Sequence, residues 1–248
     1  MRRVVWGVLA AVFAVSVWQA VVTLTGVPRF ILPSPFTVAE TWWTNRALIA
    51  EHTVVTAIEI VLGLLVGAVL GIVTALSLAA SPLARDLMRP ILVFTQALPV
   101  FALAPILTLW FGFGLGSKIA MAVLIIYFPI TSAFFDGLMR TPPGYLDLAR
   151  TMHASGRSTL WHIRVPAALP SLASGFKLAA VYAPIGAVIG EWVGASRGLG
   201  YLMLLANGRA KTDLMFAALF TLGVLSIVLY VTVNRLTTAA LARHTPGI

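Results

Sequence analysis

Six stretches of this chain are each apolar over the length that an α-helix needs to cross a lipid bilayer. They cover residues 4–22, 60–80, 91–111, 119–135, 173–189 and 214–233. About 20 helical residues, each rising about 1.5 Å, span the roughly 30 Å hydrocarbon core. Only 10% of the residues are charged, whereas soluble domains have about 25%. We therefore expect an all-α integral membrane protein with one transmembrane domain over residues 1–248.

With their flanking residues, the expected transmembrane helices cover 4–22, 54–80, 91–111, 117–138, 170–193 and 213–236. The fourth apolar stretch is the shortest, so five spans are the alternative to six. Residues 1–20 also have features of a secretory signal, because Arg2 and Arg3 precede an apolar run. That run is long for a signal peptide, and Trp18-Gln19-Ala20 is a poor cleavage site, so an uncleaved first span is favoured.

The basic residues between the spans indicate which side of the membrane each loop occupies. With six spans both termini share a side, and that side carries eleven Lys and Arg residues against six on the other. The smaller group is Arg29, Arg46, Lys118, Arg197, Arg209 and Lys211. Because cytoplasmic loops carry the excess of basic residues, we expect both termini and the loop 145–166 to be cytoplasmic. The net charge of +9 has the same explanation, and nucleic acid is not an expected partner.

A helix over residues 35–50 is expected on the outer side. Ser34 is a suitable N-cap, and Pro35 falls at the first helical position, where its missing N–H is harmless. Trp42 and Trp43 are typical of a helix that lies at the membrane interface. The alternative is a simple connector.

Two patterns within the spans predict how the helices pack and bend. Gly63, Gly67 and Gly71 recur every four residues, which allows a neighbouring helix to approach closely. In the third span, Pro99 and Pro105 each remove a backbone hydrogen bond and favour a kink.

Two carboxylates lie within or near the bilayer, where an unpaired charge is costly. Glu59 lies near the outer end of its span and is expected to reach water. Glu191 is followed by Trp192 at the outer end of the fifth span, which suits gating or a structural hydrogen bond, and direct substrate contact is less favoured. Together with Pro99 and Pro105, these residues are the candidates for the pathway and its gate.

The sequence offers no nucleotide or metal site. The segment GFGLGSK at residues 112–118 lacks the P-loop spacing and is expected to be an external turn. The chain has no cysteine, and its histidines, at 52, 153, 162 and 244, do not have metal-ligand spacing.

The segment 145–166 is a polar and basic stretch between apolar spans. Residues 146–153 have helical spacing, a bend is expected at Ser155-Gly156, and residues 158–163 form a second segment. Pro166 should end that segment, because it restricts Val165 to extended geometry. Such a compact projection fits a groove on another protein.

This loop resembles the EAA loop of permease subunits of ATP-binding-cassette (ABC) importers, whose pattern is E-A-A-x3-G-x9-I-x-L-P. On this chain the pattern falls on Asp147, Leu148, Ala149, His153, Ile163, Val165 and Pro166. Ala149, Ile163 and Pro166 match it, and Asp147 and Val165 are conservative replacements. His153 stands where the family has a glycine that marks the tight bend after the coupling helix, and Leu148 replaces an alanine.

Other segments resemble the nitrate/sulfonate/taurine group of these permeases. They are LPSPFTV at residues 32–38, the T-x-x-E-x-x-x-G spacing of Thr56, Glu59 and Gly63, ALPVFALAPILTLWFGFG and GEWVGASRGLGYLM. The last of them is most similar to transporters for the aminopyrimidine (hydroxymethylpyrimidine) precursor of thiamine, and riboflavin transporters are close.

The resemblance implies a type I importer permease (MetI-like) fold in a bacterial plasma (inner) membrane. Two permease copies would form the pathway, two ATPase subunits would dock on the loops, and an extracytoplasmic binding protein would deliver the substrate. The docking residues that it implies are Asp147, Ala149, Arg150, His153, Ala154, Ser155, Ile163, Val165 and Pro166. ATP-Mg would bind only to the ATPase subunits, so this chain would be no enzyme and would hold no cofactor. The expected substrate is the thiamine pyrimidine precursor, with riboflavin, sulfonate or taurine, and nitrate as alternatives.

Two other classes of membrane protein fit the sequence less well. An ion-coupled secondary transporter should place carboxylates or broken helices near the midplane, often in repeated halves. A membrane enzyme needs a cluster of catalytic groups at one depth. Arg150, Arg157 and Arg164 could serve an anionic lipid, but no nucleophile–base pair accompanies them.

Overall fold

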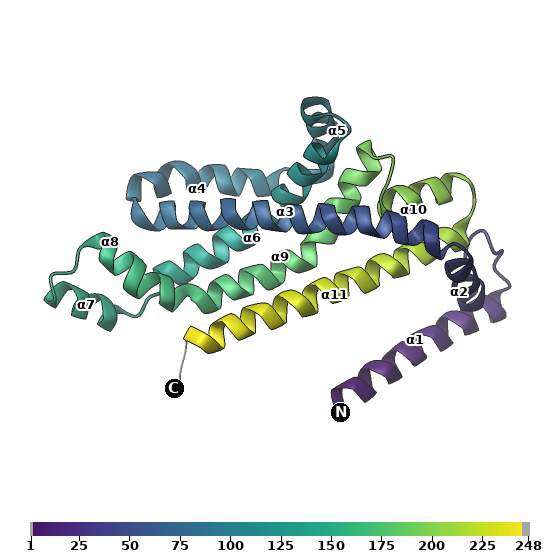
Figure 1. Ribbon diagram of the computed structural model, residues 1–248, viewed down its shortest axis with the longest axis horizontal. Coiled ribbons are helices and arrows are strands. Elements are labelled where there is room, and N and C mark those ends of the chain that lie inside the picture. Colours follow the sequence, from purple (N-terminus) through teal and green to yellow (C-terminus); the bar gives the residue numbers. More distant parts are fainter. Residues whose placement is uncertain (1, 245–248) are drawn as a thin grey trace.

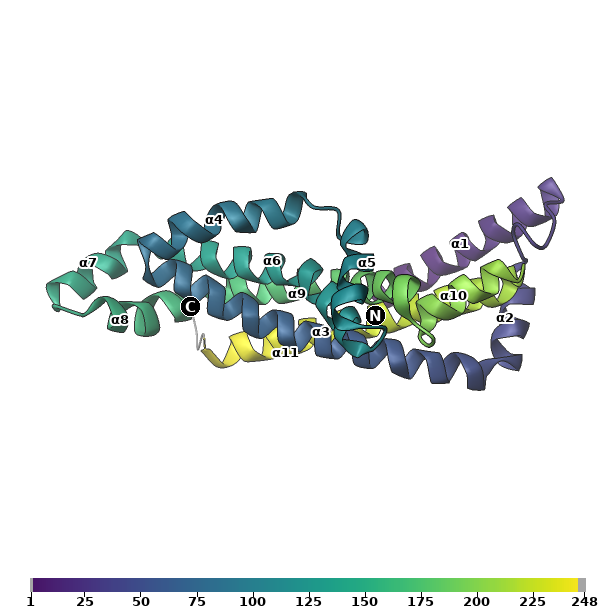
Figure 2. The same cartoon turned by 90° about the horizontal axis from the view of Figure 1, so that it is seen from above.

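The computed structural model describes residues 2–244, and every element within that range is a helix. In chain order these are α1 (Arg2–Thr25), α2 (Pro35–Thr44), α3 (Arg46–Ala80), α4 (Pro82–Ala97), α5 (Val100–Phe111), α6 (Leu115–Met139), α7 (Pro143–Thr151), α8 (Gly156–Thr159), the π-helix η1 (Leu160–Arg164), α9 (Val165–Gly194), α10 (Leu199–Gly208) and α11 (Thr212–His244). The long helices form an elongated bundle, with α7 and α8 at one end and α2 and α10 at the other (Figures 1 and 2).

Five helical segments of the described chain are long and apolar enough to cross a membrane. They are Val5–Thr25, Arg46–Ala80, Leu115–Met139, Gly156–Gly194 and Thr212–Arg243. The pair α4 and α5 meets the same test as a unit, which gives six spans if it is counted as one. The expectation of an all-helical membrane protein with five or six spans is therefore confirmed.

The span expected over residues 91–111 differs from a single helix, because α4 and α5 meet at an angle of 102°. The break lies at Leu98-Pro99, where Leu98 has extended geometry with ψ of 126°. A residue before proline avoids helical geometry, and proline has no N–H to continue the helix. Pro99 is thus the residue before α5, whereas Pro105 lies inside α5.

Helix α6 packs against both α3 and α9, and small residues make this contact close. Gly63, Gly67 and Gly71 of α3 face Ala122, Ile126 and Ile130 of α6. A Cβ atom added at Gly63 would lie 2.6 Å from the Ala122 Cβ, and one at Gly67 would lie 2.7 Å from the Ile126 Cγ1. Any larger side chain in this row would therefore separate α3 from α6.

Helix α2 crosses the outer end of α11. Ser34 caps it by accepting a hydrogen bond from the Thr37 N–H at 3.2 Å, and Pro35 is its first residue. The Thr41 hydroxyl donates to Asp213, and the Trp42 indole N–H donates to Thr221. This helix ends at Thr44 rather than at residue 50, because α3 begins at Arg46.

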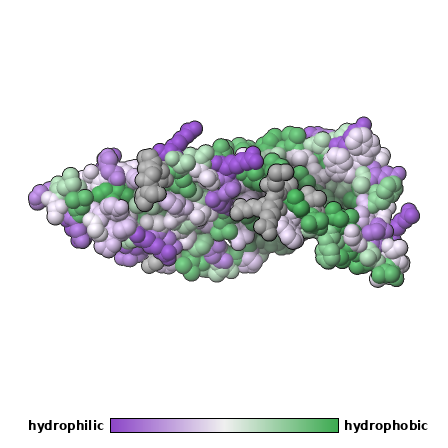
Figure 3. Space-filling model, turned by 90° about the horizontal axis from the view of Figure 1, so that it is seen from below, coloured by the Kyte–Doolittle hydropathy of each residue, from purple (hydrophilic) through white to green (hydrophobic). Residues whose placement is uncertain are grey.

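Much of the molecular surface is apolar, as a bilayer requires. Green apolar residues cover large areas of the face in Figure 3, and purple hydrophilic residues are frequent at the α7–α8 end and at the opposite tip. Helix α1 is almost entirely exposed, and Trp18 attaches it to α11 by stacking on Phe216 and Phe220.

Candidate functional site

The segment 143–166 contains the implied docking residues, and its α7–α8 part projects from one end of the bundle (Figure 1). Asp147 and Arg150 are both exposed on α7 and form an ion pair at 3.0 Å, whereas Ala149 is buried. Ala154 and Ser155 lie in the turn after α7, and Ser155 caps α8 by accepting from the Ser158 N–H at 3.2 Å.

Helix α7 ends at His153 in a Schellman motif. The His153 N–H donates to the Arg150 carbonyl at 3.0 Å, and the Ala154 N–H donates to the Ala149 carbonyl at 2.9 Å. His153 has φ of 51°, the left-handed conformation that usually selects glycine at this position. The chain thus makes the tight bend that the glycine marks in the EAA pattern, although a histidine occupies the position.

Helix α7 also has an exposed apolar stripe that the sequence analysis did not identify. Tyr145, Leu148 and Met152 are 56%, 57% and 72% exposed, and their i, i+3, i+7 spacing places them on one face. The signal was present in the sequence as three apolar residues on one face of a short helix in an otherwise polar segment.

The expected helix break before Pro166 does not occur. Val165 is helical, with φ of −61° and ψ of −52°, and the chain is helical from Gly156 to Gly194. In a regular α-helix the proline ring would collide with a carbonyl one turn earlier, and the wider π-turn of η1 lies where that collision would occur. Ile163 and Val165 are half-buried, and Pro166 is exposed.

A second candidate site is a buried polar cluster toward the opposite end, where Glu191 holds the start of α10. Its carboxylate accepts a hydrogen bond from the Thr56 hydroxyl at 2.6 Å and further bonds from the Gly200 and Tyr201 N–H groups. The Thr56 hydroxyl also accepts from the Leu199 N–H at 2.8 Å.

The His52 ring completes this arrangement, because its Nδ1 accepts from the Gly198 N–H at 2.9 Å. The first four N–H groups of a helix have no partner within the helix. In α10 these are residues 198–201, and all four donate to side chains of α3 and α9. The negative carboxylate at the positive end of α10 adds a favourable dipole interaction. Glu191 therefore has a structural hydrogen-bonding role.

Two glycines allow this close approach. Gly198 has φ of 113°, and a Cβ atom there would overlap the Glu191 carboxylate. A Cβ at Gly200 would lie 2.8 Å from Glu191 Oε2. The turn before α10 therefore requires glycine for both its backbone geometry and its space.

Glu59 is fully buried and does not reach water, contrary to expectation. It pairs at 3.0 Å with Lys118, which the sequence analysis had placed in an external loop but which is buried in α6. Neither Glu59 oxygen has another hydrogen-bond partner, so Lys118 is what compensates the buried charge. His52 and Lys118 were missed as site residues. The signal for His52 was its place in a polar row with Thr56 and Glu59 on the face that continues to Gly63.

The remaining pathway candidates are one residue of α9 and two prolines of the α5 region. Trp192 follows Glu191 and is partly exposed, whereas Pro99 and Pro105 lie at the start of and inside α5. Among the described residues, no group of three or more His, Asp or Glu side chains is arranged to hold a metal ion.

Comparisons with known proteins agree with this architecture. Residues 67–243 match the family model described as the binding-protein-dependent transport system inner membrane component. A Haemophilus influenzae protein named "Probable ABC transporter permease protein" is 52% identical over 218 residues, which cover 88% of this chain and 89% of that protein. The formylaminopyrimidine transport permease protein ThiX of Halalkalibacterium halodurans is 36% identical over 221 residues, covering 89% and 88%. The riboflavin transport system permease protein RibX of Chloroflexus aurantiacus is 36% identical over 216 residues, covering 86% and 81%.

A solved structure shares the fold. One chain in a structure of inward-facing conformations of the MetNI methionine ABC transporter aligns with a TM-score of 0.60 and 20% identity, covering 86% of this chain and 99% of that chain. The expected MetI-like fold is thus confirmed. On the evidence of the family match and the similarity to its relatives, this chain belongs to the binding-protein-dependent transport system inner membrane components and is a permease subunit of an ABC importer, a transport component rather than an enzyme.

Proposed function

We propose that two copies of this chain form the membrane pathway of an importer for the pyrimidine precursor of thiamine. Two ATPase subunits dock on the two α7 loops, and an extracytoplasmic binding protein delivers the substrate at the α2–α10 end. The family itself implies an ATPase subunit and a binding protein. The copy numbers and the substrate are part of the proposal.

The observation that carries the docking proposal is the apolar stripe of Tyr145, Leu148 and Met152. These three side chains remain exposed at the polar α7–α8 end of the molecule. Apolar residues at i, i+3 and i+7 are the pattern by which a helix binds in a groove of a partner. The ion pair of Asp147 and Arg150 lies beside the stripe and supplies a polar rim.

Ala149 supports the docking helix from within. It is 3% exposed, and its carbonyl accepts the bond that ends the helix. A bulky residue at this position acts on the shape of the loop, whereas a change at Leu148 acts on the contact itself. The positions His153, Ala154 and Ser155 set the bend between α7 and α8, and Ile163, Val165 and Pro166 join the loop to α9.

Docking is tested with the permease reconstituted in liposomes with its ATPase and binding protein. We expect Leu148→Ser to weaken ATPase association by about 1–2 kcal/mol, or roughly five- to thirtyfold, because it removes a leucine from the interface. ATP hydrolysis stimulated by the binding protein should fall with it. Leu65→Ser is the matched control, because Leu65 of α3 is 58% exposed but lies far from the loop. Equal loss of association in both variants, or in neither, contradicts the docking assignment.

The gate is proposed at the outer end, where α9 is joined to α10 through Glu191. Trp192 follows Glu191 in α9, and Glu59 lies one helical turn after Thr56 in α3. Helix α5 packs against α9 and begins after the bend at Pro99. Glu191→Gln keeps the size of the side chain but weakens the bonds from residues 200 and 201, which are stronger to a charged acceptor. We expect assembly to be preserved and substrate uptake to fall. Unchanged uptake would leave Glu191 with a structural role alone.

The proposed substrate rests on the similarity of this chain to permeases whose names give the transported solute. The two transporters at 36% identity that have a named solute are for formylaminopyrimidine and for riboflavin, both of which are nitrogen heterocycles. Sulfonate and taurine permeases are 28% and 26% identical. Uptake of labelled formylaminopyrimidine, riboflavin and taurine by liposomes with the cognate binding protein distinguishes them. If riboflavin or taurine is taken up in a saturable, ATP-dependent manner and formylaminopyrimidine is not, the proposed substrate is wrong, whereas the assignment as a permease stands.

A further inference from the structure

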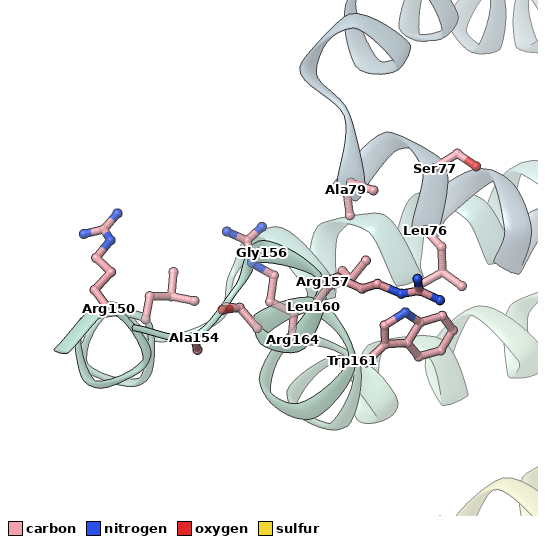
Figure 4. A pocket seen from close by; sticks show the side chains of 13 residues that line it. Leu76, Ser77, Ala79, Arg150, Ala154, Gly156, Arg157, Leu160, Trp161 and Arg164 are labelled. Atoms are coloured by element: carbon pink, nitrogen blue, oxygen red, sulfur yellow. The ribbon is translucent and has the colours of Figure 1, made fainter. Parts of the chain in front are cut away.

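A basic hollow lies at the α7–α8 end of the molecule, between the last turn of α3 and the segment α7–η1. Its volume is about 780 Å³, within the range of about 300–1,000 Å³ that is usual for ligand sites. Three arginines, Arg150, Arg157 and Arg164, line it together with Trp161. Figure 4 shows these side chains around the hollow, with Arg150 on α7 and Trp161 on the opposite side.

Two of the three positive charges in this hollow are not compensated within the described chain. The hollow has no acidic residue in its lining. Arg150 pairs with Asp147, but neither Arg157 nor Arg164 forms an ion pair among the described residues. Within the described part of the chain, the Arg164 guanidinium donates a hydrogen bond to the Met139 sulfur, at 3.8 Å. A planar guanidinium group without a carboxylate partner favours bidentate binding of an oxyanion such as phosphate.

The lining is amphipathic, and it lies where a membrane span ends. Leu76, Ala79 and Ala80 provide an apolar wall from the final turns of α3, the spanning helix that ends at Ala80. Trp161 is 50% exposed on the other wall, and tryptophan is enriched at the depth of lipid headgroups. A ligand that fits both walls has an anionic head and an apolar body.

The hollow opens on a different face of α7 from the apolar docking stripe. Leu146 and Arg150 line the hollow, whereas Tyr145, Leu148 and Met152 form the stripe. At about 100° per residue, the centres of these two groups lie about 150° apart around the helix. A protein bound to the stripe therefore leaves the arginines accessible from the membrane side.

We propose that this hollow binds the headgroup of an anionic phospholipid, whose negative charge is balanced by Arg157 and Arg164. Trp161 packs against the glycerol region, and the acyl chains leave along the end of α3. Basic pockets between membrane helices on the cytoplasmic side are suited to such headgroups, and the positive-inside distribution places this end in the cytoplasm. This site is independent of the transported solute.

The test uses the purified full-length permease alone, so that it does not depend on the ATPase or on transport. Native mass spectrometry measures the lipid retained from an equal mixture of phosphatidylglycerol and phosphatidylcholine with identical acyl chains. We expect the wild type to retain phosphatidylglycerol preferentially, and Arg157→Gln/Arg164→Gln to lose about tenfold or more of that preference. Arg235→Gln/Arg243→Gln, which removes the same charge from exposed positions of α11, should retain the wild-type preference.

Further measurements test the geometry of the site and the source of the anion. Arg157→Lys/Arg164→Lys keeps the charge but loses the bidentate geometry, so we expect intermediate retention; this variant also decides the question if the glutamine variant does not fold. Displacement of the lipid by inorganic phosphate or glycerophosphate at equal concentration would overturn the lipid assignment. Unchanged lipid selectivity in the glutamine variant would overturn it as well. In that case a separate binding measurement with the ATPase added follows, and loss of association in the same variant would assign the arginines to a protein interface.

Discussion

Replacing Thr56 with valine tests whether side chains of α3 hold the start of α10. Valine has nearly the shape of threonine but lacks the hydroxyl, which is fully buried and makes two bonds across the fold. The substitution leaves the Leu199 N–H and one Glu191 oxygen without these partners. Each buried group left unsatisfied costs about 1–3 kcal/mol, so we expect the α10 corner to be destabilised by about 3 kcal/mol.

Amide hydrogen exchange measures this loss at the residues concerned. Local opening that is easier by about 3 kcal/mol raises the exchange rate about 100-fold, and we expect this at the amides of residues 198–201. Thr56→Ser keeps the hydroxyl and should retain protection. Thr53→Val is the matched control, because the Thr53 hydroxyl bonds only to the Ile49 carbonyl of its own helix. Wild-type protection of residues 198–201 in Thr56→Val would refute the reasoning.

Three other substitutions test features of the same fold. Lys118→Met leaves the buried Glu59 charge without its partner, which costs about 3–5 kcal/mol. Thermal unfolding in detergent should show this loss of stability, and the double variant Lys118→Met/Glu59→Gln should recover most of the lost stability. A double variant as unstable as the single one would contradict the pairing. Gly198→Ala should expose residues 195–208 to limited proteolysis, whereas Gly26→Ala, also at positive φ but in open space, should not. His153→Gly relieves a left-handed residue, so we expect stability to rise by up to about 1 kcal/mol without loss of ATPase coupling; a decrease in either would mean that the histidine ring itself is needed.

The apolar runs predict the membrane helices well because each is long enough to span and the bilayer leaves few alternatives to a helix. The positions at which these helices break are less predictable from the sequence. Leu98-Pro99 and Val165-Pro166 carry the same local signal, yet the chain bends by 102° at the first and stays helical through the second. The difference is the π-turn before Pro166 and the packing of Val165 against a buried cluster, and neither is encoded within a few residues of the proline.

The candidate sites also contain features that the sequence predicts and features that only the tertiary structure shows. The EAA-like spacing located the loop, and the T-x-x-E-x-x-x-G spacing of Thr56, Glu59 and Gly63 was one of the segments that carried the family resemblance. The partners themselves are tertiary, since Thr56 and Leu199 are separated by 143 positions in the chain. Lys118 was assigned to the external side because it ends the segment GFGLGSK, which was expected to form a turn between two spans. Only the packing of α6 against α3 shows that it is buried with Glu59.

The uninterrupted helical path from Gly156 to Gly194 has a mechanical consequence. Its 39 residues extend roughly 58 Å at about 1.5 Å per residue, so a single rod connects the α7–α8 projection to the corner where Glu191 holds α10. If α8 moves along the helix axis by the length of one side chain, the corner at which Glu191 holds α10 moves by nearly the same distance, because a hydrogen-bonded helix compresses little along its axis. Bending is easier than compression, since Pro170 and Pro184 each interrupt the backbone hydrogen bonding of this rod. Displacement along the rod axis and bending at Pro170 and Pro184 are therefore the motions that this chain can transmit across the membrane.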